Sequence, residues 1–150
     1  MTIKTWTAKI LDFRTHDGDT LTDVLLDVGW GVRLSRSGTA TLSIRLTSSA
    51  GPVNAPEVTG AESQAGKLVS WYVDGALRAA KELWVVSREL SRDAYGRCVG
   101  EVHLRGSDDH DYELGLRLAD LKLVKACGPG GKRVPFTTEE LASICERLGE

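Results

Sequence analysis

The first third of the chain alternates apolar and polar residues in the way that β-strands do. Residues 5–13 (TWTAKILDF) and 21–28 (LTDVLLDV) are rich in β-branched and apolar side chains, and the turn-rich segment 15–20 (THDGDT) separates them. Asp-Gly between two such runs is a strong turn signal and predicts a hairpin. A third strand is predicted over 39–46, where strict alternation puts Arg45 on the face opposite the apolar row.

The middle and the end of the chain change to helical spacing. Apolar residues recur every three or four positions over 61–79 and again over 112–125, which predicts two helices. Strand character returns between them, at 82–88 and 97–105. Residues 137–140 (TTEE) have the pattern of a capping box and predict the start of a short last helix.

The predicted order of elements is therefore βββ–α–ββ–α–α. Five short antiparallel strands with one helix inserted after the third favour an α+β fold, a small closed barrel of which the OB-fold is the first candidate. We expect this domain to span residues 1–127 and a C-terminal helical appendage to span 128–150.

Composition and charge narrow the class of protein. With 41% hydrophobic and 27% charged residues, the chain is typical of a globular domain and not of a disordered one. A net charge of −2 excludes a strongly basic nucleic-acid binder but leaves room for a small basic cleft. Three widely spaced cysteines favour reduced thiols, and neither a signal peptide nor a membrane span is visible. We expect a cytoplasmic protein that does not bind membranes.

Several common catalytic motifs are missing from the sequence. There is no G-x-S-x-G and no GxGxxG, and Gly131-Lys132-Arg133 lacks the Ser or Thr of a P-loop. The three histidines do not have metal-ligand spacing and are predicted to lie at the surface. Carboxylates and arginines remain as the carriers of chemistry.

Two segments place carboxylate or amide oxygens on tight loops. In residues 17–20 (DGDT), two aspartates on a turn can hold a hard divalent cation, or they can form an Asx-stabilised hairpin turn. In residues 54–57 (NAPE), Pro56 stiffens a loop from which Asn54 and Glu57 project oxygens. The alternative for this second segment is a proline-containing loop that enters a helix.

A third segment, residues 93–97 (DAYGR), ends with an arginine that opens a strand. A guanidinium held in this way can meet phosphate oxygens through its fork of N–H groups. Arg45 is the other candidate for this role, and either arginine taken alone is typical of a solvated surface charge.

Taken together and in order, the three segments resemble the staphylococcal nuclease (thermonuclease) family. The family has D-G-D-T after its first strand, then R-L, a D-x-P-E-like stretch, a helix and a D-x-Y-G-R turn. The matching residues here are 17–20, 45–46, 54–57 and 93–97, and the resemblance extends from Trp6 to Ala126.

The resemblance implies an OB-type barrel that hydrolyses the phosphodiester bonds of DNA and RNA with calcium as cofactor. Asp19, Asn54 and the backbone carbonyl of Ala55 would bind the calcium ion. Asn54 stands where the family usually has aspartate, which removes one negative charge and implies weaker calcium binding.

The resemblance also implies the catalytic roles. Glu57 would orient or deprotonate the attacking water, Arg45 and Arg97 would hold the scissile phosphate, and Tyr95 would lie near the nucleotide. Because the chain between positions 45 and 54 is longer than in the family, Arg33 and Arg36 remain alternatives to Arg45.

Two functions from different classes follow. The first is a metal-dependent nuclease with DNA or RNA as its substrate. The second is a catalytically weakened OB-fold module that binds nucleic acid or a protein partner. Aromatic residues make up 6% of the chain, and the tryptophans occur mostly in apolar patterns, which weighs against a stacking surface. Asn54 weighs in favour of the binding module.

Overall fold

The chain folds around a closed β-barrel. The computed structural model describes residues 5–37, 40–88 and 97–149. Within those residues the chain forms a five-stranded barrel with three α-helices, so the predicted α+β, OB-fold-like architecture is confirmed. None of the helices in this part of the chain is long and apolar enough to cross a membrane.

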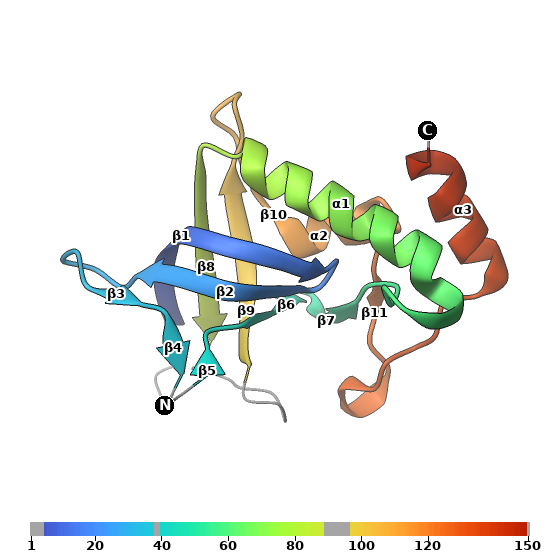
Figure 1. Ribbon diagram of the computed structural model, residues 1–150, viewed down its shortest axis with the longest axis horizontal. Coiled ribbons are helices and arrows are strands. Elements are labelled where there is room, and N and C mark those ends of the chain that lie inside the picture. The colour runs from blue at the N-terminus through green and yellow to red at the C-terminus, as the bar shows by residue number, and fades with distance from the viewer. Residues whose placement is uncertain (1–4, 38–39, 89–96, 150) are drawn as a thin grey trace.

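The barrel closes through one parallel pairing. Its strands are β1 (Thr5–Asp17), β2 (Thr20–Asp27), β6 (Ile44–Ser48), β8 (Glu82–Arg88) and β9 (Cys98–Arg105). Antiparallel pairing runs in the order β9-β8-β1-β2-β6, and β6 then pairs with β9 in parallel, with Arg45 opposite Val99 (Figure 1). This last pairing joins β6, which carries Arg45, to β9, which begins directly after Arg97.

Six short strands lie outside the five barrel strands among the described residues. They are β3 (Arg33–Leu34), β4 (Arg36–Ser37), β5 (Ala40–Thr41), β7 (Gly51–Asn54), β10 (Asp111–Glu113) and β11 (Lys125–Ala126). The strand predicted over 39–46 is therefore wrong as one continuous element, and Thr39 lies outside the described residues. Its two parts have different partners, because β5 pairs with β4 whereas β6 pairs with β2 and β9.

The helices follow the predicted order but not all of the predicted bounds. They are α1 (Ser63–Ala79), α2 (Leu114–Asp120) and α3 (Thr138–Leu148), with 3-10 turns η1 (Gly60–Glu62) and η2 (Pro129–Gly131). The helix predicted over 112–125 is too long, because β10 pairs with β9 before it and β11 pairs with β7 after it. Lys122, at a φ of 57°, turns the chain away from the helical path.

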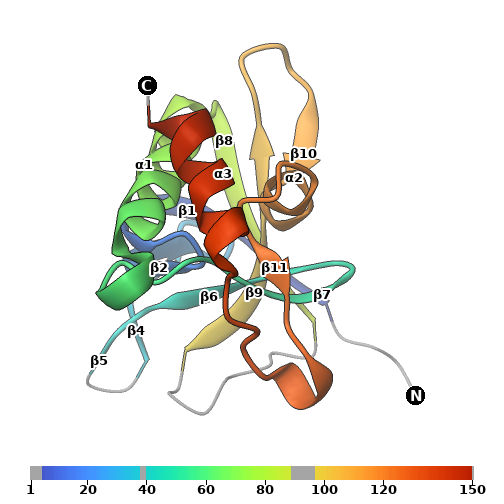
Figure 2. The same ribbon diagram turned by 90° about the vertical axis from the view of Figure 1, so that its right-hand side faces the viewer.

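The C-terminal segment is part of the buried core. Thr137 Oγ1 accepts a hydrogen bond from the Glu140 N–H and Glu140 Oε1 accepts one from the Thr137 N–H, so the predicted capping box is confirmed. Both views show α3 beside α1, and Ile144 of α3 is completely buried (Figures 1 and 2). Phe136, just before α3, belongs to the same apolar cluster.

Helix α1 is positioned by a glycine at its packed face. A Cβ on Gly66 would lie 2.0 Å from the carbonyl oxygen of Glu57 and 2.9 Å from that of Pro56. The backbone of the 54–57 loop therefore rests directly on the helix, at a separation that no side chain permits. Gly75 in the same helix has open space around it.

We expect Gly66→Ala to destabilise the fold by about 1–3 kcal/mol, because the loop backbone must move away from α1. The matched control Gly75→Ala should stabilise it by about 0.5–1 kcal/mol, since it removes only the helix penalty of glycine. Urea unfolding of the two variants measures both changes. Equal effects in the two variants would contradict the close approach of the loop.

Candidate functional site

The 17–20 turn joins β1 to β2 and packs against two other segments. The Asp19 N–H donates to Asp17 Oδ1 at 3.1 Å, and the Thr20 hydroxyl donates to Asp19 Oδ1 at 3.0 Å. A Cβ on Gly18 would lie 2.6 Å from Val69 Cγ1 and 2.7 Å from the Cβ of Ala55. The predicted hairpin is confirmed, and its tip lies against α1 and the 54–57 loop.

Asp19 connects three parts of the chain. Its Oδ2 accepts a hydrogen bond from the Ala55 N–H at 2.8 Å and lies 3.5 Å from Arg45 Nη1. Only 12% of the Asp19 side chain is exposed, so these donors replace most of the water that an ionised carboxylate needs. The structure therefore brings together the turn, strand β6 and the 54–57 loop, as the predicted site requires.

The two predicted phosphate-binding arginines meet at the same turn. Arg45 Nη1 donates to the carbonyl of Leu46 at 3.0 Å, beside its ion pair with Asp19. Arg97 Nη1 donates to the Thr20 hydroxyl at 3.4 Å, and that hydroxyl in turn donates to Asp19. Both guanidiniums are thus connected to one carboxylate, although their positions are 52 residues apart in the sequence.

The alternative arginines lie on strands other than those that meet at this turn. Arg33 lies opposite Asp27, at the far end of β2 from Thr20. Arg36 follows on β4, in a separate two-stranded sheet (Figure 1). Arg45 is therefore the residue that the fold places at the site. Tyr95, the predicted nucleotide contact, lies outside the described residues.

Asn54 is turned toward the C-terminal segment. It is 1% exposed, its Nδ2 donates to the carbonyl of Val134 at 3.4 Å, and its Oδ1 accepts from Cys127 Sγ at 3.5 Å. On the next residue, the Ala55 carbonyl oxygen accepts a hydrogen bond from Arg133 Nη2 at 3.1 Å. Both predicted calcium ligands of this loop therefore have partners from residues 127–134.

Glu57 lies at the open edge of the site. About half of its side chain is exposed, at 53%, and its Oε1 is 3.2 Å from Arg133 Nε. Its backbone N–H donates to Glu62 Oε1 at 2.9 Å, which holds the loop to the start of α1. The predicted general base is thus fixed by its backbone while its carboxylate reaches solvent.

Arg133 and Glu62 are residues of this site that sequence reasoning missed. Both oxygens of Glu62 contact the Arg133 guanidinium, and Glu62 Oε2 also accepts from the Phe136 N–H at 3.2 Å. Burial alone would raise the pKa of Glu62, but the hydrogen bonds from Arg133 and from two backbone N–H groups hold it below its usual range. In the sequence, Arg133 stands out only as part of Gly131-Lys132-Arg133, an incomplete P-loop pattern, and no local pattern connects that segment to position 57.

The described residues do not fit a calcium ion in this arrangement. Calcium requires about six to eight oxygen ligands. The Asp19 carboxylate is paired with Arg45, the Asn54 oxygen contacts Cys127, and the Ala55 carbonyl binds a guanidinium. Calcium binding therefore stays a prediction of the sequence.

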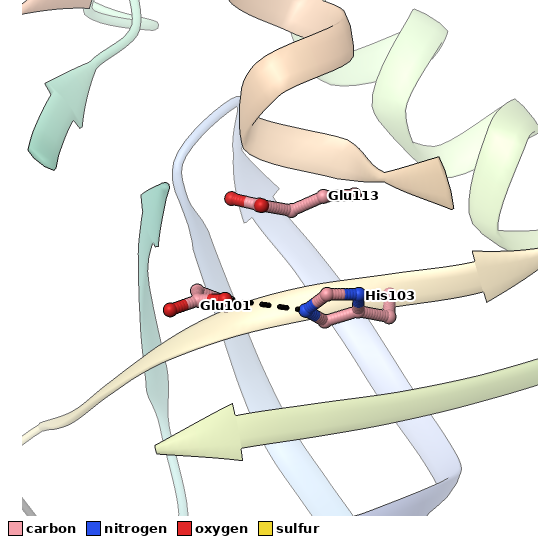
Figure 3. Close-up of side chains that lie close together, drawn as sticks. All are labelled: Glu101, His103 and Glu113. Atoms are coloured by element: carbon pink, nitrogen blue, oxygen red, sulfur yellow. Dashed lines mark hydrogen bonds and ion pairs between the residues drawn. The ribbon is translucent and has the colours of Figure 1, made fainter. Parts of the chain in front are cut away.

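A second polar cluster lies on the barrel, away from this turn. Glu101 and His103 of β9 and Glu113 of β10 each place one possible ligand atom within 4.8 Å of the others (Figure 3). His103 Nε2 is 3.3 Å from Glu101 Oε1, and the imidazole stacks on Trp84. His103 is therefore half-buried rather than a surface histidine.

Glu113 in that cluster is held by a neighbouring hairpin. The N–H and the hydroxyl of Ser49 each donate to one of its carboxylate oxygens at 2.7 Å. Ser49 lies between β6 and β7, so these bonds tie the β6–β7 hairpin to β10. Glu113 therefore has a structural role in this fold.

The tryptophans are more exposed than their sequence patterns predict. Trp6, Trp30 and Trp71 are each more than half exposed, and Trp30 is fully exposed at the loop after β2. Trp30 and Trp84 line a groove of about 450 Å³ at the end of the β1–β2 hairpin opposite Asp19. The apolar patterns around Trp6, Trp30 and Trp71 therefore do not correspond to buried rings, and their weight against a stacking surface is reduced.

Asp17 makes the stability of the site depend on pH. Burial raises the pKa of Asp17 from 3.8 to about 7; the hydrogen bond and charge of Asp19 act in the same direction, and the Asp19 N–H opposes them. Between these two pKa values the folded chain holds a proton that the unfolded chain has released. The free energy of unfolding should therefore fall as the pH rises from about 4 to about 7.

We expect Asp17→Asn to remove this part of the pH dependence and to stabilise the protein above pH 7, because no buried charge then faces Asp19. Thermal unfolding of the wild type and the variant across that pH range, in a chelating buffer, measures the difference. Parallel curves for the two proteins would contradict the raised pKa.

Neither a protein-family model nor a curated protein matches the sequence of this chain.

Proposed function

We propose that this chain is a nuclease that hydrolyses phosphodiester bonds of DNA or RNA at the Asp19 turn. One observation carries the proposal. Arg45 and Arg97, from different parts of the barrel, are both connected to Asp19, directly or through Thr20. The predicted base, Glu57, comes from the loop whose backbone binds the same aspartate.

The arginines suit the charge of the substrate. A phosphodiester is anionic and repels an attacking hydroxide, so guanidinium groups that hold its non-bridging oxygens lower the barrier. Arg45 contacts Asp19 and the carbonyl of Leu46 through Nη1, and 19% of its side chain is exposed. Guanidiniums gathered locally in this way are compatible with a net charge of −2 for the whole chain.

Glu57 supplies the base in this proposal. A water oxygen bonds to phosphorus while its proton passes to the Glu57 carboxylate, and the P–O ester bond breaks. The leaving oxygen takes a proton from solvent. Glu57 pairs with Arg133, but both side chains are partly exposed, so freeing the carboxylate costs only about 1 kcal/mol or less.

The alternative function is a binding module without catalysis. Two observations in the structure add to the support that the sequence gives this binding module. Glu57 has a cationic partner, and the exposed Trp30 beside Lys9 and Trp84 offers rings on which bases can stack. The experiments below separate this alternative from the nuclease.

The first test is cleavage of single-stranded and duplex DNA, and of RNA, by the purified protein, with calcium and with a chelator. We expect cleavage by the wild type and a loss of about a hundredfold or more in Glu57→Gln, with oligonucleotide binding retained. Gln keeps the size of the side chain and removes its basic oxygen. Cleavage by the variant at the wild-type rate contradicts the role of Glu57, and binding without any cleavage favours the module.

The second test compares two arginines. We expect Arg97→Ala to reduce cleavage by about 10²-fold or more, because a group that stabilises developing charge is lost. Arg33→Ala is the matched control, since it removes the same charge at the other end of β2. Its cleavage rate should stay near that of the wild type, and equal losses in both variants would point to net charge instead of a site.

A further inference from the structure

The guanidinium of Arg133 lies among the oxygens that the sequence assigns to calcium binding and water activation. Its Nη2 donates to the Ala55 carbonyl at 3.1 Å and its Nε is 3.2 Å from Glu57 Oε1. Asp19 binds the N–H of the same Ala55. We propose that this guanidinium, in place of a divalent cation, is the resident positive charge of the phosphodiester site.

The charge of the predicted calcium ligands matches a monovalent cation. Asn54 and the Ala55 carbonyl are neutral, and Asp19 is the single carboxylate of the three. Asp19 is already paired with Arg45. A divalent ion would therefore gain little from these ligands, whereas a guanidinium needs no more than the carbonyl and carboxylate oxygens that it contacts.

The segment that delivers Arg133 also keeps Asn54 away from a metal. The Asn54 amide contacts Cys127 and Val134, on either side of Arg133 in the chain, from a position that is 1% exposed. To bind an ion, its oxygen would have to leave this buried position. The same stretch of chain therefore removes one predicted ligand and supplies a cation.

The Arg133 guanidinium is fixed by protein contacts on one side, and part of its side chain is exposed to solvent. Glu62 contacts Nη1 and Nη2, and Phe136 lies 5.9 Å from the guanidinium carbon. One third of the Arg133 side chain stays exposed. A guanidinium fork in this position suits phosphate oxygens, so Arg133 joins Arg45 and Arg97 as a third basic group. This identification of the ligand rests on the proposed function; the absence of calcium binding does not.

The first test measures calcium binding directly and needs no activity. Calcium chloride alone is titrated into the wild type and into Asp19→Asn by calorimetry, and the thermal unfolding of both is measured with millimolar calcium and with chelator. We expect no saturable calcium binding by either protein and no change in either melting temperature between calcium and chelator. Saturable calcium binding, or stabilisation by calcium, that the wild type has and Asp19→Asn lacks would overturn the proposal.

The second test uses a fluorescein-labelled single-stranded DNA oligonucleotide and fluorescence anisotropy, with Glu57→Gln as the background to prevent cleavage. We expect the same Kd in calcium and in chelator, within about twofold, and a loss of about tenfold in Arg133→Gln. Lys132→Gln is the matched control, because it removes an exposed charge from the adjacent residue. Circular dichroism confirms that each variant is folded at the assay temperature.

Two results of this second test contradict the proposal. One is binding that chelator weakens about tenfold or more, and the other is equal binding by folded Arg133→Gln and Lys132→Gln. The outcome for the role of Arg133 can be distinguished from the outcome for the proposed nuclease activity. Cleavage that requires calcium keeps the nuclease and overturns the role of Arg133, whereas calcium-independent binding without cleavage keeps the role of Arg133 and overturns the nuclease.

Discussion

The hydrogen bond from the Ala55 N–H to the Asp19 carboxylate is the contact on which the arrangement of this site depends. It ties the tip of the β1–β2 hairpin to the loop after β7, and Asp19 is too deeply buried to exchange that donor for water. The glycines at positions 18 and 66 permit the close approach that this hydrogen bond needs. Each lets a backbone approach where any Cβ would collide, so the turn, the loop and α1 meet at one place.

Around this contact the chain builds an alternating array of charges. Asp19 faces Arg45, Arg133 lies between Glu57 and Glu62, and Arg97 reaches the array through Thr20. Partly buried charges of opposite sign orient one another and exclude water, which in the proposed function would hold them ready for an anionic substrate. The three guanidiniums are balanced by the carboxylates of Asp19, Glu57 and Glu62, so the array has fixed positive groups without a net positive charge.

The parts that could be predicted from sequence are those encoded in contiguous residues. Strand alternation, the Asp-Gly turn, the 61–79 periodicity and the capping box each signal a local structure, and the structure contains them. The ordered motifs also located Asp19, Arg45, Ala55, Glu57 and Arg97 in one region. Position 133 was not predictable in this way, since its partners lie more than 70 residues away and nothing near it in the sequence points to them. The ends of α2 were missed for a similar reason, because pairing with β9 and β7 overrides a helical pattern.

The parallel pairing of β6 with β9 has a consequence for how the protein acquires its site during folding. Hairpins such as β1–β2 and β8–β9 join near neighbours in the chain, whereas β6 and β9 are brought together from either side of α1. Such non-local pairings form late, because a long loop must be closed before any contact compensates for its entropy. Arg45 and Arg97 flank this closure, so an incompletely folded or newly synthesised chain has its hairpins but not its pair of guanidiniums. Under the proposed function, affinity for a phosphodiester would therefore arise only when the barrel closes, and a bound nucleic acid strand would stabilise the closed barrel.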